Sequence, residues 1–235
     1  MNAKIWGCML LLSWGVQAQF GPHIFSKDPI INLENFDKQK VHWGYFLGFN
    51  SFDFKIDYLA PQAKEIEVKN TTGFNVGLVG NLRINEYLDL RFEPGLYYTQ
   101  RDLVFPNFTR QTQYLREVPS TYIMFPLLLK FSSLRTGNVR PYLVGGFSRA
   151  LNLSSNERSQ EDNSQQKFRM KQWTNNYELG FGIDLYFEYF KFSPSIRGVF
   201  GIDNEIIYDN DPNSPWTSNI DGLKTRAILI NFTFH

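Results

Sequence analysis

The residue types that most often carry metal or nucleophilic chemistry are sparse in this sequence. The chain has three histidines, at positions His23, His42 and His235, and they are far apart in the sequence. Their spacing matches no metal-binding motif. Cys8 is the single cysteine, which excludes an internal disulfide and a cysteine-rich metal site. No glycine-rich loop leads from a strand into a helix, so nucleotide-binding motifs are missing. This pattern predicts a non-enzymatic protein without cofactor or metal.

Acidic residues are concentrated in the stretch 203–221. They are Asp203, Glu205, Asp209, Asp211 and Asp221. Carboxylate oxygens are suitable ligands for a divalent cation, but this spacing matches no calcium-binding loop. We therefore interpret the stretch as a solvated loop, with a partner contact around Trp216 as the alternative.

A third group of charged residues occupies every second position of otherwise apolar segments. Its members are Asp89, Arg91, Glu93, Lys130, Glu178, Asp184, Lys191 and Arg197. The two signs are present in equal number. If these side chains share one enclosed face, they should pair into a network that fills the interior. A polar conduit for a solute is the alternative.

The elements that would position these charges are strands. In the clearest case, Leu88, Leu90 and Phe92 alternate with Asp89 and Arg91. Successive side chains of a strand point to opposite faces, so one face here is apolar and the other charged. The same period of two recurs along the chain. With residues 88–99, it predicts eight strands, the others lying in 41–50, 74–83, 118–131, 140–153, 176–185, 191–202 and 227–234.

Two of these segments are less regular. Pro126 lacks a backbone donor and predicts a bulge or a local bend within 118–131. In 140–153, the pattern does not decide whether Tyr142 and Val144 or Leu143 and Phe147 face outward.

The connections between the predicted strands alternate strictly in length. Three are short, at 83–87, 132–139 and 187–190. Four are long and polar, at 58–72, 100–116, 154–171 and 203–222. Outer-membrane barrels have this arrangement, with short periplasmic turns and long outer loops. The fold class predicted is therefore an all-β, closed antiparallel transmembrane barrel of about eight strands, with both ends of the chain on the periplasmic side.

Composition agrees with this fold. The chain has 235 residues and a formal net charge of +1, which gives no basic footprint for nucleic acid. Aromatic residues make up 17% of the chain, yet no segment after residue 18 has the long apolar run of a membrane helix. In a barrel, only alternate residues contact lipid, which reconciles polar composition with many aromatics. A soluble β-sandwich is the alternative, but its thin core would have to absorb all these Phe, Tyr and Leu side chains.

The beginning of the chain has the features of an exported protein. Residues 1–18 predict a cleaved signal peptide, with Lys4 before an apolar stretch and small residues at the cleavage site. Within it, Cys8 is interpreted as an apolar leader residue rather than a lipid anchor. Residues 19–40 are expected to be a periplasmic N-terminal segment, and residues 41–235 the barrel. The predicted location is the outer membrane of a Gram-negative bacterium.

One stretch resembles a known family. The sequence NLENFDKQKVHWGYFLGFN (residues 32–50) is similar to the PorT/SprT family of the Bacteroidetes. The segments TYIMFPLLLKF (121–131) and RPYLVGGF (140–147) resemble the broader group of Bacteroidetes outer-membrane barrels. The resemblance implies a non-enzymatic component of type IX protein secretion and gliding motility that is not itself the translocation pore. It implies outer-membrane lipid and other secretion components as partners, and no small-molecule substrate.

Two further hypotheses stay open at this point. One is a general small barrel for adhesion or for transit of an apolar ligand, which a lateral gap beside Pro126 would favour. The other is a lipid-modifying barrel enzyme that depends on His42.

Overall fold

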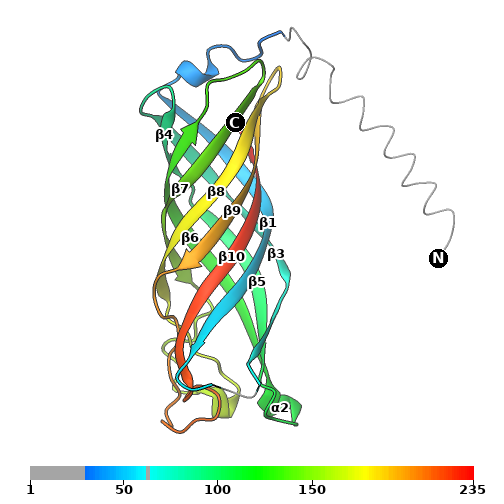
Figure 1. Cartoon of the computed structure of the whole chain (residues 1–235), viewed down its shortest axis with the longest axis vertical. Coiled ribbons are helices and arrows are strands. Elements are labelled where there is room, and N and C mark those ends of the chain that lie inside the picture. Colours follow the sequence, from blue (N-terminus) through cyan, green and yellow to red (C-terminus); the bar gives the residue numbers. More distant parts are fainter. Residues whose placement is uncertain (1–29, 62–63) are drawn as a thin grey trace, which may run out of the picture.

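The computed structural model describes residues 30–61 and 64–235, and consists almost entirely of antiparallel strands (Figure 1). The predicted signal peptide 1–18, with Cys8, lies outside the described residues, as do residues 19–29 of the predicted N-terminal segment, with His23. The strands are β1 (Val41–Tyr58), β2 (Glu67–Asn70), β3 (Thr72–Arg83), β4 (Leu88–Phe92), β5 (Gly95–Val104), β6 (Leu115–Ser132), β7 (Val139–Asn152), β8 (Trp173–Tyr186), β9 (Lys191–Gly201) and β10 (Ile220–Phe234). The short helices are η1 (Phe36–Lys38), α2 (Gln111–Tyr114) and η2 (Asn163–Gln165).

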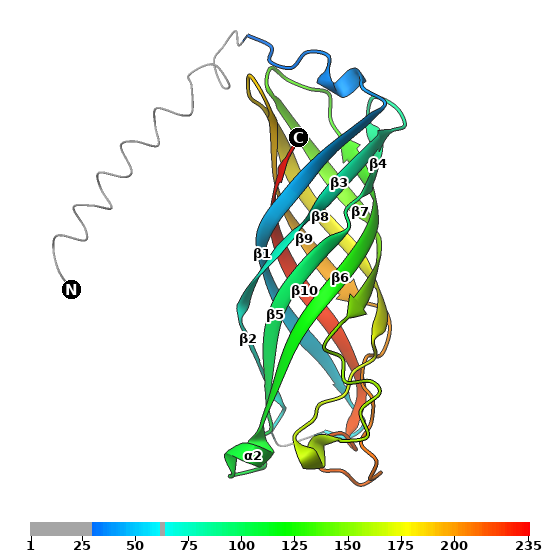
Figure 2. The ribbon, with the colours of Figure 1, turned by 180° about the vertical axis from the view of Figure 1, so that it is seen from behind.

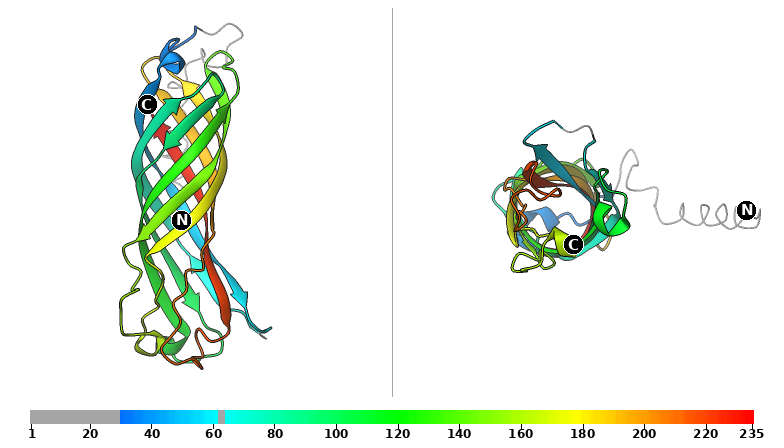
Figure 3. Two further views of the ribbon diagram at one scale, coloured as in Figure 1. Left: turned by 90° about the vertical axis from the view of Figure 1, so that its left-hand side faces the viewer. Right: turned by 90° about the horizontal axis from the view of Figure 1, so that it is seen from below.

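The strand pairings form a ring. Strand β1 pairs with β10 on one side and with β3 on the other, and the remaining strands follow in the order β9, β8, β7, β6 and β4. The pairs β2/β3 and β4/β5 are each one strand with an interruption, since β2 and β3 both pair with β5, and β4 and β5 both pair with β6. The ring therefore has eight strands, as the sequence predicted, and Figure 2 and Figure 3 show it from behind and along its axis.

The two faces of the ring differ as the period of two requires. Large apolar side chains stand exposed on the outside, and alternate residues are buried inside. In β7, Leu143 and Phe147 are 62% and 68% exposed, whereas Tyr142 and Val144 are buried, which decides the face that the sequence left open. Within residues 30–61 and 64–235, no helix is both long and apolar enough to cross a bilayer.

The two ends of the ring differ in their connections, as predicted. Residues 84–87, 133–138 and 187–190 make the short turns at one end, which we call the short-turn end. The long connections lie at the opposite, long-loop end and include α2 and η2 (Figure 1). The described beginning of the chain and the end of β10 both lie at the short-turn end.

The bulge expected at Pro126 is not present. The ladder between β6 and β7 runs without a register shift from Tyr122 to Ser132. On its other side, Pro126 lies beside the interruption between β4 and β5, where its carbonyl accepts from the Glu93 amide at 3.2 Å. The missing donor of Pro126 therefore lies beside the interruption at Pro94, another residue without an amide hydrogen. The ladder gives no lateral gap between β6 and β7 at this position.

Candidate functional site

The interior near the short-turn end contains all eight charged residues of the predicted network. Each is buried, and all except Asp89 make ion pairs. Asp89 lies opposite Lys130 in the β4–β6 ladder, but it makes no ion pair within the described part of the chain. The remaining seven form two clusters, one around Asp184 and one around Glu93.

The first cluster joins three strands through one carboxylate. Asp184, on β8, pairs with Lys130 Nζ at 2.5 Å and with Lys191 Nζ at 4.0 Å. Its other oxygen accepts from the Ser193 hydroxyl at 2.6 Å. Lys191 stands on the adjacent strand β9, but Lys130 stands on β6, so the carboxylate also ties β8 to a strand that is not its neighbour. Such ion pairs and hydrogen bonds offset the free energy that is lost when a carboxylate is removed from water.

The second cluster crosses the interior from wall to wall. Glu93 directly follows β4. Its carboxylate forms ion pairs with Arg91 Nε at 2.9 Å and with Arg197 Nη1 at 2.7 Å. Arg197 also contacts Glu178 on β8 at 3.0 Å between Nε and Oε2. Strands β4 and β9 are opposite each other in the ring, so the Glu93–Arg197 pair is a strut across the lumen. An interior of eight strands is narrow enough for side chains to span it in this way.

Two histidines that are far apart in the sequence join this network. The β1–β10 pairing brings His42 and His235 to a ring separation of 5.0 Å. His42 Nε2 lies 2.8 Å from Asn81 Nδ2 and 3.3 Å from Lys191 Nζ. His235 Nε2 lies 3.4 Å from Arg91 Nη2. From the sequence alone, these histidines are expected to be isolated, because 193 positions separate them and only the closure of the ring brings them together.

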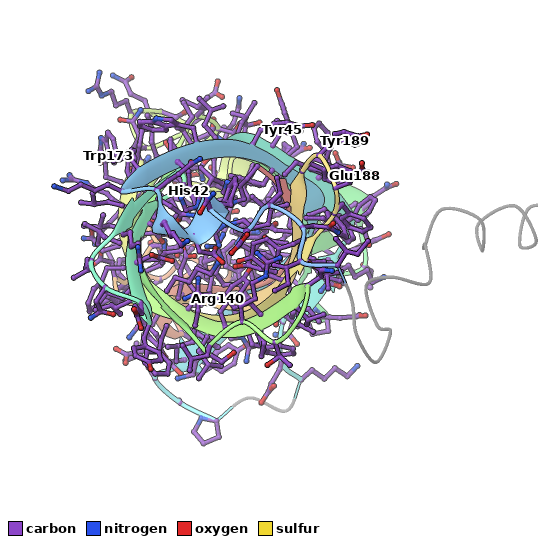
Figure 4. The ribbon with its side chains drawn as sticks, turned by 90° about the horizontal axis from the view of Figure 1, so that it is seen from above. His42, Tyr45, Arg140, Trp173, Glu188 and Tyr189 are labelled. Atoms are coloured by element: carbon purple, nitrogen blue, oxygen red, sulfur yellow. The ribbon has the colours of Figure 1, made fainter. Side chains whose placement is uncertain are left out.

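Residues 30–38, which we call the cap segment, lie across the mouth at the short-turn end (Figure 4). Asp37 in η1 accepts from the Tyr186 hydroxyl at 2.6 Å. It also pairs with Arg140 at 3.5 Å and with Arg135 at 3.9 Å. Phe36 points at the network below, with its ring 5.0 Å from that of His42.

A second set of bonds fixes the beginning of the cap segment. Asn138, in the turn between β6 and β7, accepts from the Asn32 amide at 2.9 Å and donates to the Ile30 carbonyl at 2.8 Å. Asn32 Nδ2 donates to the Tyr186 carbonyl at 3.1 Å, and Arg135 donates to the Asn32 carbonyl. The sequence placed a polar periplasmic segment here but gave no signal of its docking, because each anchor comes from a distant turn or strand.

The interior changes character toward the long-loop end. A middle layer is apolar and includes Phe46, Phe52, Val79, Met124 and Leu229. A further apolar cluster lies beneath the long loops, with Phe54, Leu103, Val118, Met170, Ile206 and Leu223 among its members. Between them, Arg101 donates to Thr225 Oγ1 at 3.0 Å and its guanidinium lies 3.7 Å from the centre of the Phe54 ring.

Side chains of the long loops make more buried contacts than a solvated loop would have. Glu205 is buried and accepts from the Thr225 amide and hydroxyl at 2.8 and 2.9 Å. Asp209 accepts from Ser214, Thr217 and Asn163. The interpretation of 203–221 as a solvated loop is therefore wrong for these two carboxylates, whose partners lie close to them only after the loop has folded.

Two more contacts tie the loops together. Trp216 stacks on Phe108 at 5.2 Å and donates to the Gln113 carbonyl at 2.9 Å, so it binds a neighbouring loop. Asp162 caps η2, and the bonds it accepts from the Ser164 side chain and backbone hold the pKa of its carboxyl below its usual range. In the described residues, no three His, Cys, Asp or Glu side chains gather as metal ligands.

Comparison with known proteins agrees with this architecture. Residues 17–206 match the outer membrane protein beta-barrel domain family. The chain belongs to this family. Its location is the outer membrane, where the exposed apolar side chains on the outside of the ring contact lipid. No curated protein matches the sequence.

Several solved structures have a similar chain course at low identity. OprG from Pseudomonas aeruginosa is 16% identical, with a TM-score of 0.46 over 83% of this chain and 93% of that one. Neisserial surface protein A is 12% identical, with a TM-score of 0.43 over 83% and 98%. Ail of Yersinia pestis is 12% identical, with a TM-score of 0.34 over 83% and 98%.

Proposed function

We propose that this protein is a non-enzymatic, closed transmembrane barrel whose blocked interior makes it a docking component rather than a pore. In this proposal, the short-turn end faces the periplasm and the long loops face outward, as in other barrels of this kind. Residues 1–18 act as a cleaved signal peptide, residues 19–40 lie in the periplasm, and residues 41–235 span the membrane.

The observation that carries the proposal is the Glu93–Arg197 strut beneath the cap segment. The strut joins opposite walls of the ring with a distance of 2.7 Å between Arg197 Nη1 and Glu93 Oε2. Above it, Phe36 and Asp37 lie across the mouth. A solute would have to break buried ion pairs to pass, and leaving one member of such a pair unpaired costs about 3–5 kcal/mol.

A barrel with a filled interior can act only through its surfaces. The cap segment offers one, because Ile30 and Ile31 remain 72% and 56% exposed although the backbone around them is anchored. The resemblance of residues 32–50 to the PorT/SprT family supports the finer assignment to type IX secretion and gliding motility in the Bacteroidetes. In this role the protein would contact other secretion components in the periplasm and would act on no small-molecule substrate.

Deletion of the gene in its own bacterium tests the assignment. Secreted proteins should remain in the cells, and mass spectrometry of the culture medium measures this directly. The full-length chain supplied in trans should restore export. Undiminished secretion by the deletion strain would contradict the assignment.

Point variants then locate the docking face. The double variant Ile30→Ser/Ile31→Ser changes two exposed side chains of the cap segment. It should lower secretion while the barrel still assembles in the outer membrane. Leu59→Ser changes a side chain of similar exposure at the long-loop end and serves as the matched control. If Leu59→Ser alone lowered secretion, the docking face would be the loops and not the cap.

A further inference from the structure

A group of basic side chains stands on the outer surface of the ring, near the long-loop end. Lys55 on β1 and Lys224 on β10 lie directly opposite each other in the ladder, and Arg226 follows on the same face. These three residues make the outer basic site. Like charges that face each other across two strands repel, so the Lys55–Lys224 arrangement by itself destabilises the sheet.

The neighbouring carboxylates compensate only part of this charge. Arg226 pairs with Asp53 at 2.6 Å, and Lys55 pairs with Asp57 at 3.2 Å. Lys224 makes no ion pair or hydrogen bond with its side chain in the described part of the chain. The three basic residues and the two carboxylates Asp53 and Asp57 together have a net charge of +1. The unpaired charge is that of Lys224, directly opposite Lys55.

The backbone leaves a hollow beside these charges. Strand β9 ends at Gly201, one residue after Phe200, which pairs with Arg226 of β10. Strand β10 extends beyond this pair toward the long-loop end, as far as Ile220. The Thr225 amide is paired with no residue of β9, and it donates instead to the Glu205 carboxylate at 2.8 Å. A cleft of about 370 Å³ results on the outside. Its lining includes the three basic residues together with Tyr177, Phe200 and Ile202.

The position of the site relative to the apolar belt indicates the kind of ligand. Along β10, the outward residues Ile228 and Ile230 are exposed and apolar, and Arg226 is the first charged residue beyond them. At the same level, Tyr177 and Phe200 stack at 5.0 Å between ring centres. Aromatic and basic side chains at this level lie where lipid headgroups begin.

We infer that the outer basic site binds the phosphate of an anionic membrane lipid in the leaflet on the long-loop side. The phosphate would lie between Lys55 and Lys224, and relieve the repulsion between them. The aromatic pair would contact the uncharged part of the headgroup, and the acyl chains would follow Ile228 and Ile230. A dissolved phosphate ion would make no favourable contact with the apolar half of this cleft, whereas a lipid would. We therefore assign a lipid.

Native mass spectrometry of the full chain, folded in detergent, tests the inference with diphosphoryl lipid A as the probe. The wild type should retain the lipid. Lys55→Gln/Lys224→Gln should weaken binding about tenfold or more, because the loss of even one charge-assisted hydrogen bond costs about 1.4 kcal/mol or more, which is a factor of ten. Lys40→Gln/Lys69→Gln removes the same charge from exposed lysines elsewhere and should bind like the wild type.

Two further arms separate the possible sources of affinity. Lipid A without its phosphates should bind the wild type as weakly as the diphosphoryl lipid binds the Lys55→Gln/Lys224→Gln variant. Inorganic phosphate at the same concentration should leave no adduct. The inference is overturned if the dephosphorylated lipid binds as well as the phosphorylated one, if inorganic phosphate binds equally, or if the two double variants behave alike.

Discussion

The two halves of the interior are held together by different forces. Near the short-turn end, charged groups cross the lumen, and Asp184 and Glu93 each pair with two cations. Near the long-loop end, apolar side chains such as Leu103 and Leu223 pack beneath the loops, and Arg101 is bonded to neutral oxygens. Ion pairs depend on particular partners at fixed positions, whereas apolar packing depends on volume. The first half should therefore fail when one charge is lost, and the second when volume is lost.

The largest effect is expected from Asp184→Asn. The substitution keeps the shape of the side chain but leaves Lys130 and Lys191 as two buried cations without their shared carboxylate. Loss of one member of a buried pair costs about 3–5 kcal/mol. Urea unfolding of the barrel in lipid vesicles, followed by tryptophan fluorescence, measures the change.

Two further variants complete this experiment, one as a control and one that should restore part of the lost stability. Asp221→Asn changes an exposed carboxylate at the start of β10 and should alter the free energy of unfolding by less than about 0.5 kcal/mol. Adding Lys130→Met to Asp184→Asn should recover part of the loss, since one stranded cation is removed. Equal unfolding midpoints for Asp184→Asn and Asp221→Asn would show that the ion pairs do not hold this half together.

Leu223→Ala tests the other half. Leu223 is completely buried beneath the loops, and its truncation leaves a cavity that should cost about 2–5 kcal/mol. Leu223→Met keeps most of the volume and should cost less than about 1.5 kcal/mol. If the methionine variant were as unstable as the alanine variant, volume would not be what matters at this end. Urea unfolding in the same vesicles provides the comparison.

A smaller and more local effect is expected at the cap segment. Asp37→Ala removes the acceptor for Tyr186 and the partner of Arg140, in a partly exposed position that water screens. The substitution should lower the free energy needed to open the cap segment by about 1–2 kcal/mol, while the free energy of unfolding of the barrel stays the same. Hydrogen exchange of the amides of 36–39 reports the opening. Glu34→Ala, an exposed neighbour, should leave exchange unchanged. Unchanged exchange in both variants would show that Asp37 does not hold the cap segment in place.

The smallest effect concerns the loop held by Asp162. The pKa of this carboxyl lies below its usual value because Ser164 donates to it. A depressed pKa means that the stabilisation is present above the usual pKa of about 3.8 and is lost as pH falls below it. The amide resonances of Ser164 and Asn210 should therefore shift only below this pH, and Asp162→Asn should remove the titration. Glu161→Gln is the control, and a titration that persists in Asp162→Asn would assign it to another group.

The ring itself could be predicted from the sequence, because period-two alternation and the alternating lengths of the connections are local properties of the chain. The eight network residues could be found for the same reason: a strand fixes which side chains share a face. The partners could not be assigned, since Glu93 and Arg197 meet only after β4 and β9 are placed on opposite walls. The His42–His235 contact, the docking of Asp37 and the burial of Glu205 depend on closure in the same way. The bulge expected at Pro126 does not form, because its missing donor falls beside the interruption between β4 and β5 and the register stays the same on both sides of it.

The central claim is that the interior is blocked, and single-channel recording on the wild-type chain in planar bilayers tests it most directly. Because the Glu93–Arg197 strut lies below the cap, neither the wild type nor Asp37→Ala should give steady currents. Stable, ohmic single-channel currents from the wild-type barrel would contradict the account and establish a conduit through the lumen.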